Sequence, residues 1–313
     1  MCIRDRIDTA LLIAFLASTA GAATPLVVAS MGELVTERSG VLNLGMEGMM
    51  LVGAVTGFGV TLATGQMWLG LLAAMAAGML MSLIFGFLVL TLQTNQVATG
   101  LALTLFGIGV SAFMGRGFVG QTVERMPQLT FPLLSDIPFV GPLLFRFDGM
   151  VYASVALVAL IGWMLARTRL GLVIRAVGES PHSAHAIGFP VIALRYGTVL
   201  FGGAMAGLGG AYLSLALTPM WVEGMTAGRG WIALAQVVFA TWKPRGVLVG
   251  AYLFGGVTVL QFHGQGLGLA IPSEFLSMLP YLATIVVLVI ICRNPQTILL
   301  NKPMSLGQNF KAD

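Results

Sequence analysis

The residues best suited to chemistry in this chain are a few polar side chains beside long apolar runs. The segment TERSGVLNLGMEG, residues 36–48, places Asn43 and Glu47 before a stretch, Gly48 to Gly115, without Asp, Glu, Lys or Arg. A charge left alone inside a bilayer costs about 2.5 kcal/mol or more. Glu47 therefore lies at a membrane interface, pairs with Arg38 or faces a polar cavity. It serves either to hold a helix start or to line a path for a solute.

A second polar segment, QTNQVATG at residues 93–100, separates two apolar runs. Asn95 and Gln96 offer donors and acceptors that suit a neutral polar ligand. The alternative is a capping turn, in which Thr94 or Asn95 binds the free amides of the next helix. The candidates for the substrate path are Asn43, Glu47, Asn95 and Gln96.

A third segment, GLVIRAVGESPHSAHAIGFPV at residues 171–191, favours a short helix. Ser180 suits its N-cap and Pro181 its first position. His182 and His185 stand three residues apart, but no third ligand is near, so we predict no metal site. A short helix of small residues is suited to docking into a groove of another protein.

The composition indicates that lipid is the solvent for most of the chain. Its 313 residues are 57% hydrophobic and 9% charged, whereas soluble domains carry about 25% charged residues. The apolar runs are about twenty residues long and apolar all round, unlike the alternating strands of a membrane β-barrel. We predict an all-α polytopic membrane protein with eight to ten transmembrane helices in one domain, residues 1–313.

Apolar windows place nine spans along the chain. The seventh is short for a hydrocarbon core of roughly 30 Å, so it is a candidate broken or re-entrant segment. The spans are residues 8–30, 41–63, 68–92, 97–118, 149–166, 196–218, 230–242, 246–263 and 278–292.

The loop charges predict the orientation. Residues 119–148 have a balanced charge, whereas residues 167–195 hold four arginines against the single acid Glu179. Because cytoplasmic loops are rich in Lys and Arg, we predict an external loop at 119–148 and a cytoplasmic loop at 167–195. The basic residues behind the net charge of +4 then lie in loops beside the membrane spans, so this charge does not indicate a nucleic acid partner.

The charge of the amino terminus disagrees with the side of the membrane on which the span count places it. Counting back places it outside, yet the opening MCIRDR holds Arg4 and Arg6. Either the count is off by one, or, as we expect, residues 1–6 are not native to the frame. A cleaved signal peptide is a further alternative, but the apolar character continues to Met31, which favours a retained span.

The sequence lacks the residues that several classes of protein need for their function. The chain has no GxxxxGKS/T loop for ATP, no HExxH, no GxSxG, and no carboxylate pair within a predicted span. Repeated arginines of a voltage sensor and a TVGYG filter are also missing. Cys2 and Cys292 have no motif spacing. We therefore predict no enzymatic activity, and no cofactor or metal in this chain.

Four motifs resemble the permease subunits of bacterial ABC importers: ERSGVLNLGMEGMMLVGA, TNQVATGLALTLFG, GLVIRAVGESPHSAHAIG and GGAMAGLGGAYLSL. This resemblance covers about residues 31 to 292, and the wider group serves branched-chain amino acids, ribose-type sugars and nucleosides. TERSGVLNLGMEGMM with NQVATGLAL is most similar to the nucleoside branch, which is linked to basic-membrane-protein lipoproteins.

The resemblance implies a multi-pass protein of the bacterial cytoplasmic (inner) membrane with several partners. These are cytoplasmic ABC ATPase subunits that hold ATP and Mg, a second homologous permease, and an extracytoplasmic substrate-binding lipoprotein. The family's coupling helix falls at residues 179–188, with Glu-Ser-Pro in place of the older Glu-Ala-Ala pattern. The candidates for ATPase coupling are Glu179, Ser180, Pro181, Ala184 and Gly188.

The function predicted first is therefore that of a permease for nucleosides. A permease of the same architecture for a simple sugar or a branched-chain amino acid is the first alternative. An autonomous secondary transporter or channel is the second. An integral membrane enzyme is disfavoured, because no catalytic constellation is present.

Overall fold

A computed structural model describes residues 2–130, 135, 140–266, 275, 278–292 and 301–311. Over these residues the only β-contacts are two isolated bridges, and seven helices are long and apolar enough to cross a membrane. Two shorter apolar helices, Arg229–Phe239 and Leu279–Ile290, lie beside them. The predicted fold class, an all-α polytopic membrane protein, is confirmed.

The helices follow one another with short connections. Two of the long helices end in π-helical turns, η1 (Phe87–Thr91) after α3 and η3 (Leu213–Leu217) after α9, and η2 (Arg116–Phe118) is a 3-10 turn after α4. The α-helices are α1 (Cys2–Arg38), α2 (Met46–Thr64), α3 (Met67–Gly86), α4 (Gln96–Gly115), α5 (Val140–Leu144), α6 (Gly149–Arg167), α7 (Arg169–Glu179), α8 (Pro181–Ala186), α9 (Val191–Tyr212), α10 (Arg229–Phe239), α11 (Pro244–Gly266) and α13 (Leu279–Cys292).

Two elements differ from the predicted spans in a way that matters for the site. The first helix does not end at residue 30 but continues to Arg38. Its last two turns carry Glu33 and Glu37, which are completely buried against other parts of the chain. Because protein rather than lipid surrounds them, the hydropathy of the sequence does not mark this part of the span. The short segment predicted at 230–242 is α10, which has only 11 residues.

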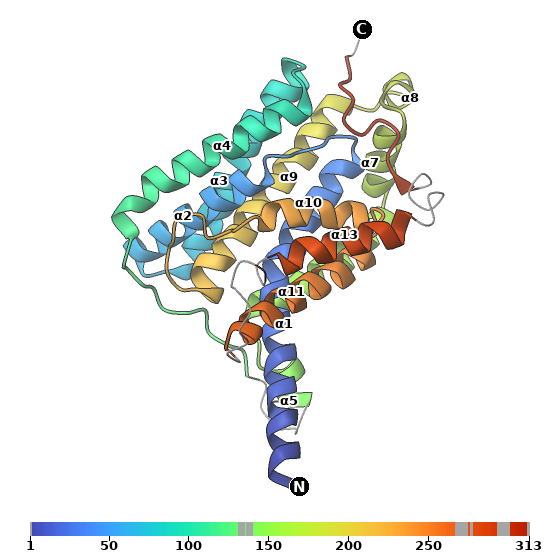
Figure 1. Cartoon of the computed structure of the whole chain (residues 1–313). Helices are drawn as coiled ribbons and strands as arrows, with labels where there is room; N and C mark the ends of the chain where they lie inside the picture. The colour runs from blue at the N-terminus through green and yellow to red at the C-terminus, as the bar shows by residue number, and fades with distance from the viewer. Residues whose placement is uncertain are drawn as a thin grey trace.

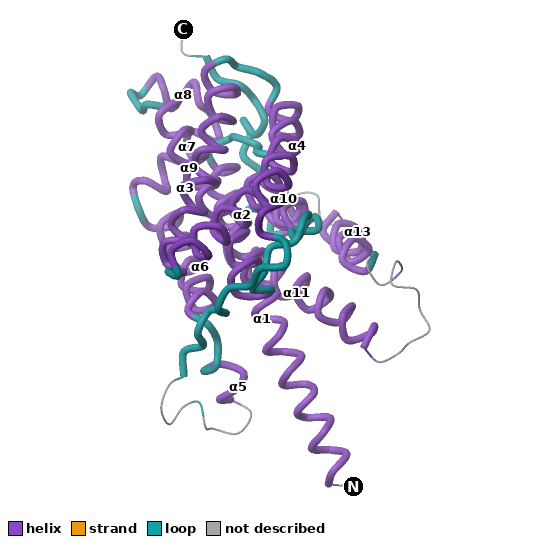
Figure 2. Tube along the Cα trace, turned by 90° about the vertical axis from the view of Figure 1, so that its left-hand side faces the viewer, coloured by secondary structure: helices purple, strands orange, loops and turns teal. Residues whose placement is uncertain are grey.

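The bundle has two distinct ends (Figures 1 and 2). Helices α7 and α8 lie at one end together with the C-terminal residues, and this is called the α8 end below. The N-terminus and α5 lie at the opposite end. Helix α9 lies inside the bundle, where it packs against α1, α2 and α3.

Close packing around α9 depends on glycine. A Cβ added at Gly207 would overlap the carbonyl oxygen of Ala74 on α3, and one at Gly53 on α2 would overlap the backbone of Gly207. Gly210 lies equally close to the backbone of Met50. Small residues at four-residue spacing let helices approach closely in lipid. The glycines of α9 therefore serve close packing against α2 and α3.

Replacement of Gly207 by Ala should destabilise the bundle by about 1–3 kcal/mol, because the added methyl group forces α3 and α9 apart. Gly197→Ala on the same helix is the matched control, since no atom lies within 4 Å of a Cβ at that position. Thermal unfolding of the purified chain in detergent measures the difference. Equal midpoints for the two variants would contradict this account of the packing.

Candidate substrate path and coupling surface

Residues 39–45 connect α1 and α2 by a loop that is buried inside the bundle. The backbone amide of Leu42 donates to Oε1 of Gln96 at 2.8 Å, and that of Asn43 donates to Oε1 of Glu33 at 3.1 Å. Oγ1 of Thr104 donates to the carbonyl oxygen of Leu44 at 2.9 Å. Irregular backbone is tolerated at membrane depth only where protein groups satisfy it, and these three side chains do so.

The contacts of the residue after the α1–α2 loop show how deep the loop lies in the bundle. Gly48, just after it, packs against the backbone of Leu103 and Thr104. Thr104 stands eight residues after the start of α4 at Gln96, which corresponds to about 12 Å along a helix. The beginning of α2 therefore lies well inside the bundle, and so does Glu47.

Glu47 holds the N-terminus of α10. Its Oε1 accepts hydrogen bonds from Oγ1 of Thr226 and from the amide of Gly228 at 2.9 Å. Its Oε2 accepts from the amide of Gly230 at 2.6 Å. The first amides of a helix have no partner within the helix and attract negative charge, so a carboxylate is well suited to this place. The pairing with Arg38 proposed from the sequence is wrong, because Arg38 donates to the carbonyl oxygens of Trp242 and Asn301 instead.

The other end of α10 is held by α1. The indole Nε1 of Trp242 donates to Oε2 of Glu37, while Arg38 donates to the carbonyl oxygen of Trp242 from Nη2 at 2.7 Å. Thr241 and Trp242 have φ angles of 49° and 53°. This left-handed conformation costs roughly 1–2 kcal/mol for a residue other than glycine. The bonds to α1 stabilise the turn that ends α10.

Glu33 and Glu37 form a pair that sequence analysis missed. Within the described residues, Oε2 of Glu33 and Oε1 of Glu37 have no hydrogen-bond partner, and both side chains are fully buried. The statement that no span holds two carboxylates is wrong, because it rests on a span that ends at residue 30. Their spacing of four residues, which places both on one helix face, was the available signal.

The four residues proposed for the substrate path lie close to this loop. Asn43, Glu47 and Gln96 are buried, whereas Asn95 is exposed. Oδ1 of Asn43 accepts from the amide of Gly45 at 2.9 Å, and Oδ1 of Asn95 accepts from that of Ala98 at 3.0 Å. Asn95 is thus an N-cap, as the capping alternative predicted. Contact of the four with a solute stays a prediction.

Helix α8 has the local structure that the sequence predicts. Oγ of Ser180 accepts from the amide of Ser183 at 3.3 Å, Pro181 is at the first helical turn, and Gly188 ends the turn with a φ of 92°. Pro181 and Ala184 face inward, whereas Glu179 and Ile187 are exposed, Ile187 to 72%. The helix therefore presents a mixed face, with Ser183, His185, Ala186 and the following Ile187, away from the bundle.

The C-terminal residues 301–311, called the C-terminal strap below, support α8 from inside. The ring of Phe310 contacts both histidine rings, and its centroid lies 5.1 Å from that of His182 and 5.6 Å from that of His185. Phe310 is 5% exposed. The two histidines that suggested a metal from their spacing therefore contact an aromatic ring. Among the residues that the structure describes, no three His, Cys, Asp or Glu side chains group to hold a metal.

The C-terminal strap also binds the loops near the candidate path. Nδ2 of Asn309 donates to the carbonyl oxygens of Gln93 and Thr94 at 2.7 and 3.0 Å, and Nε2 of Gln96 donates to Oδ1 of Asn309 at 3.1 Å. Arg195 of α9 is 1% exposed and donates to Oγ of Ser305 at 3.2 Å. No sequence motif marks residues 301–311, so this element was missed.

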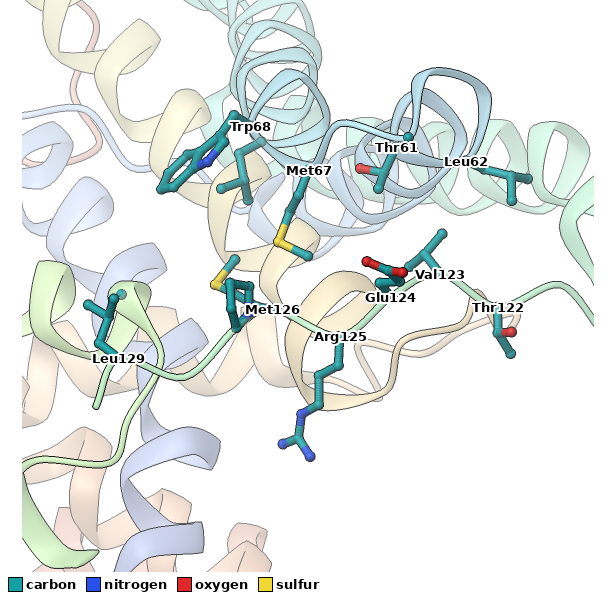
Figure 3. A pocket seen from close by; sticks show the side chains of 14 residues that line it. Thr61, Leu62, Met67, Trp68, Thr122, Val123, Glu124, Arg125, Met126 and Leu129 are labelled. Atoms are coloured by element: carbon teal, nitrogen blue, oxygen red, sulfur yellow. The ribbon is translucent and has the colours of Figure 1, made fainter. Parts of the chain in front are cut away.

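A cavity of about 600 Å³ lies at the end opposite α8. The ends of α2 and α3 form one wall and residues 122–129 the other (Figure 3). Glu124 points toward the side on which Thr61 and Met67 lie, while Arg125 points away (Figure 3). Trp68 is 75% exposed at its rim. This end therefore offers a concave surface with an acid and an aromatic ring.

Comparison with known proteins gives consistent results. Residues 15–291 match the family described as branched-chain amino acid transport system / permease component. The chain is 43% identical to a predicted glucose ABC transporter permease protein of Haloferax volcanii, over 95% of this chain and 97% of that protein. It is 36% identical to the guanosine ABC transporter permease protein NupQ of Bacillus subtilis and 34% identical to the nucleoside ABC transporter permease protein NupC of Lactococcus lactis, in each case over 85% of this chain and 88% of the relative.

Replacement of Glu47 by Gln should lower the free energy of unfolding by about 1–3 kcal/mol, because an amide nitrogen would face a backbone N–H donor in a buried place. Thermal unfolding in detergent measures this loss. The control is Glu223→Gln, which changes an exposed side chain of the same type. Unfolding midpoints that agree between the two variants would show that the carboxylate does not hold α10.

Proposed function

The chain belongs to the branched-chain amino acid transport system / permease component family, and from this premise we propose that it imports nucleosides. It is a permease subunit of an ABC transporter, a transport component rather than an enzyme. In the proposed complex it pairs with a second permease, and separate ATPase subunits supply the energy. The bundle of seven spanning-capable helices supports a multi-pass protein, and we place it in the bacterial cytoplasmic membrane.

Nucleosides are favoured as substrates by two relatives and by the polarity of the chain. Two relatives above 30% identity are named for guanosine and for nucleosides. Most polar groups within the described spans are amides and hydroxyls, which suit a neutral polar solute, and the buried Glu33 and Glu37 are each bonded to the chain through one oxygen. Glucose is the second candidate, because a relative with 43% identity is named for it. Both solutes are neutral and rich in hydroxyl groups.

We propose that the α8 end faces the cytoplasm. Arg167, Arg169 and Arg175 lie in or beside α7, and Lys243 and Arg245 lie where α10 passes to α11. Positive charge of this kind is typical of cytoplasmic ends. The opposite end, with the cavity beside Trp68 and Glu124, would then meet the extracytoplasmic substrate-binding protein.

Coupling to the ATPase subunits would use the outer face of α8. Glu179, Ser180, Pro181, Ala184 and Gly188 shape this element, and Ile187 is its most exposed apolar side chain. The C-terminal strap gives it a connection to the bundle, because Phe310 contacts α8 while Asn309 binds Gln96 and the turn before α4. A movement of α8 would therefore reach the α1–α2 loop through bonded neighbours.

The proposal is tested by uptake into vesicles that contain the complete complex. The complex is co-expressed with its ATPase subunits, the second permease and the binding protein. ATP-dependent uptake of labelled guanosine that exceeds uptake of glucose and leucine is expected. Guanosine uptake by this chain alone, without ATPase subunits or ATP, would instead show an autonomous transporter.

Two substitutions should separate docking from transmission. Ile187→Asp places a charge on the outer face of α8 and should reduce co-purification of the ATPase subunits at least several-fold. Phe310→Ala should leave co-purification intact but lower the uptake per ATP hydrolysed, because α8 loses its inner support. Met304→Asp and Met304→Ala are the controls, since Met304 on the C-terminal strap is 71% exposed. Unchanged coupling in Phe310→Ala would rule out transmission through the strap.

A further inference from the structure

A second cavity lies beside the N-terminus of α10 and has a volume of about 360 Å³. Its wall is built by residues of three helices, α10, α11 and α13. Four polar side chains line it: Arg229, Thr258, Gln261 and Tyr281. Small-molecule sites are commonly concave, mostly apolar and supplied with a few convergent polar groups.

Three of these side chains retain hydrogen-bonding atoms for a ligand. Arg229 donates from Nη1 to the carbonyl oxygens of Met225 and Thr226 at 3.1 and 3.2 Å. Its Nε and Nη2 bind no other described residue. The side-chain amide of Gln261 and the hydroxyl group of Tyr281 likewise make no hydrogen bond within the described part of the chain. Thr258 already donates to the carbonyl oxygen of Phe254 at 2.9 Å.

The positive charge of Arg229 in the cavity wall is offset by an electrostatic interaction with the nearby Glu47 carboxylate. Thr226 joins the two charged groups, because its hydroxyl donates to Glu47 while its carbonyl oxygen accepts from Arg229. The amides at the start of α10 are already bonded to the Glu47 carboxylate, so they are closed to a ligand anion. A ligand cation would meet the positive guanidinium. The pair of opposite charges leaves a site for a solute that carries hydrogen-bond acceptors but no charge.

The position also fits a transported solute. Arginine within the membrane is rare and commonly marks a substrate pathway. In many transporters, discontinuous helices place their ends beside the substrate near the middle of the bilayer. Helix α10 is such a short helix, and its N-terminus lies at the depth of Glu47, inside the bundle.

We propose that this cavity binds the base of a nucleoside, and that Arg229 recognises a base with two adjacent acceptors, as in a 6-oxopurine. The planar edge of a guanidinium matches the O6 and N7 atoms of guanine with two parallel hydrogen bonds. Gln261 supplies a further donor and acceptor, and Tyr281, half exposed, offers a ring for stacking. The assignment rests on the proposed nucleoside function and names the residues that would discriminate among nucleosides.

The experiment uses the complete complex in vesicles and compares guanosine with adenosine, which carries a donor at the position of O6. Arg229→Lys keeps the charge but loses the two-pronged edge, so the KM for guanosine should rise about tenfold or more, while the KM for adenosine changes less than about twofold. Gln261→Ala should also raise the KM for guanosine. The matched control is Arg245→Lys, a conservative change of an exposed arginine on α11.

The outcomes separate this inference from the function on which it rests. Guanosine uptake that Arg229→Lys leaves unchanged overturns the assignment of the cavity alone. An equal loss for guanosine and adenosine also overturns it, because that result indicates a structural role for Arg229. Wild-type uptake of glucose with uptake of neither nucleoside overturns the nucleoside function and base recognition together. Co-purification of all subunits with each variant verifies that the complex is assembled.

Discussion

The capping of α10 by Glu47 is the constraint on which the rest of the structure depends. The first amides of a short helix that begins inside a lipid-embedded bundle have no partner within the helix, and lipid offers them none. Glu47 satisfies two of them and the nearby Thr226 hydroxyl, from a position 179 to 183 residues away in sequence. The carboxylate in turn avoids the cost of an unpaired charge in an apolar medium. The carboxylate and the amides at the start of α10 each offset the cost of burying the other. The positions of α2 and α10 therefore depend on each other.

The buried α1–α2 loop is also held by side chains from other parts of the chain, and its contacts reach toward the α8 end. Its backbone is bonded by Gln96, Glu33 and Thr104, and Gln96 also binds Asn309 of the C-terminal strap. Because glycine contacts hold α1, α2, α3 and α9 at close range, these helices have little room to yield separately. In the proposed coupling, a displacement of α8 would therefore be carried by bonded elements rather than absorbed by loose packing. This is a physical basis for coupling between a surface helix and the interior of the bundle.

The sequence predicted what depends on local or averaged properties. Apolar runs locate most of the helices, and Ser180 with Pro181 locates the start of α8. Asn95 was correctly offered as a cap. The missed features depend on contacts between distant residues. No local sequence pattern near Glu33 or Glu37 predicts that α10 and the turn after it will cover these side chains. Residues 301–311 likewise have no apolar or capping pattern. Polar residues buried in protein within a membrane cannot be recognised by hydropathy, which measures only the average preference for lipid.

The balance of charge around α10 also bears on the choice between glucose and a nucleoside as the substrate. Glucose and guanosine differ in shape, yet both are neutral and offer hydroxyl groups or carbonyl acceptors. Because the Glu47 carboxylate interacts electrostatically with Arg229 and offsets its charge, charge alone does not favour one of these neutral solutes over the other. Discrimination must then come from geometry. A guanidinium edge rewards two acceptors held in one plane, which a purine base supplies and a saturated sugar ring does not.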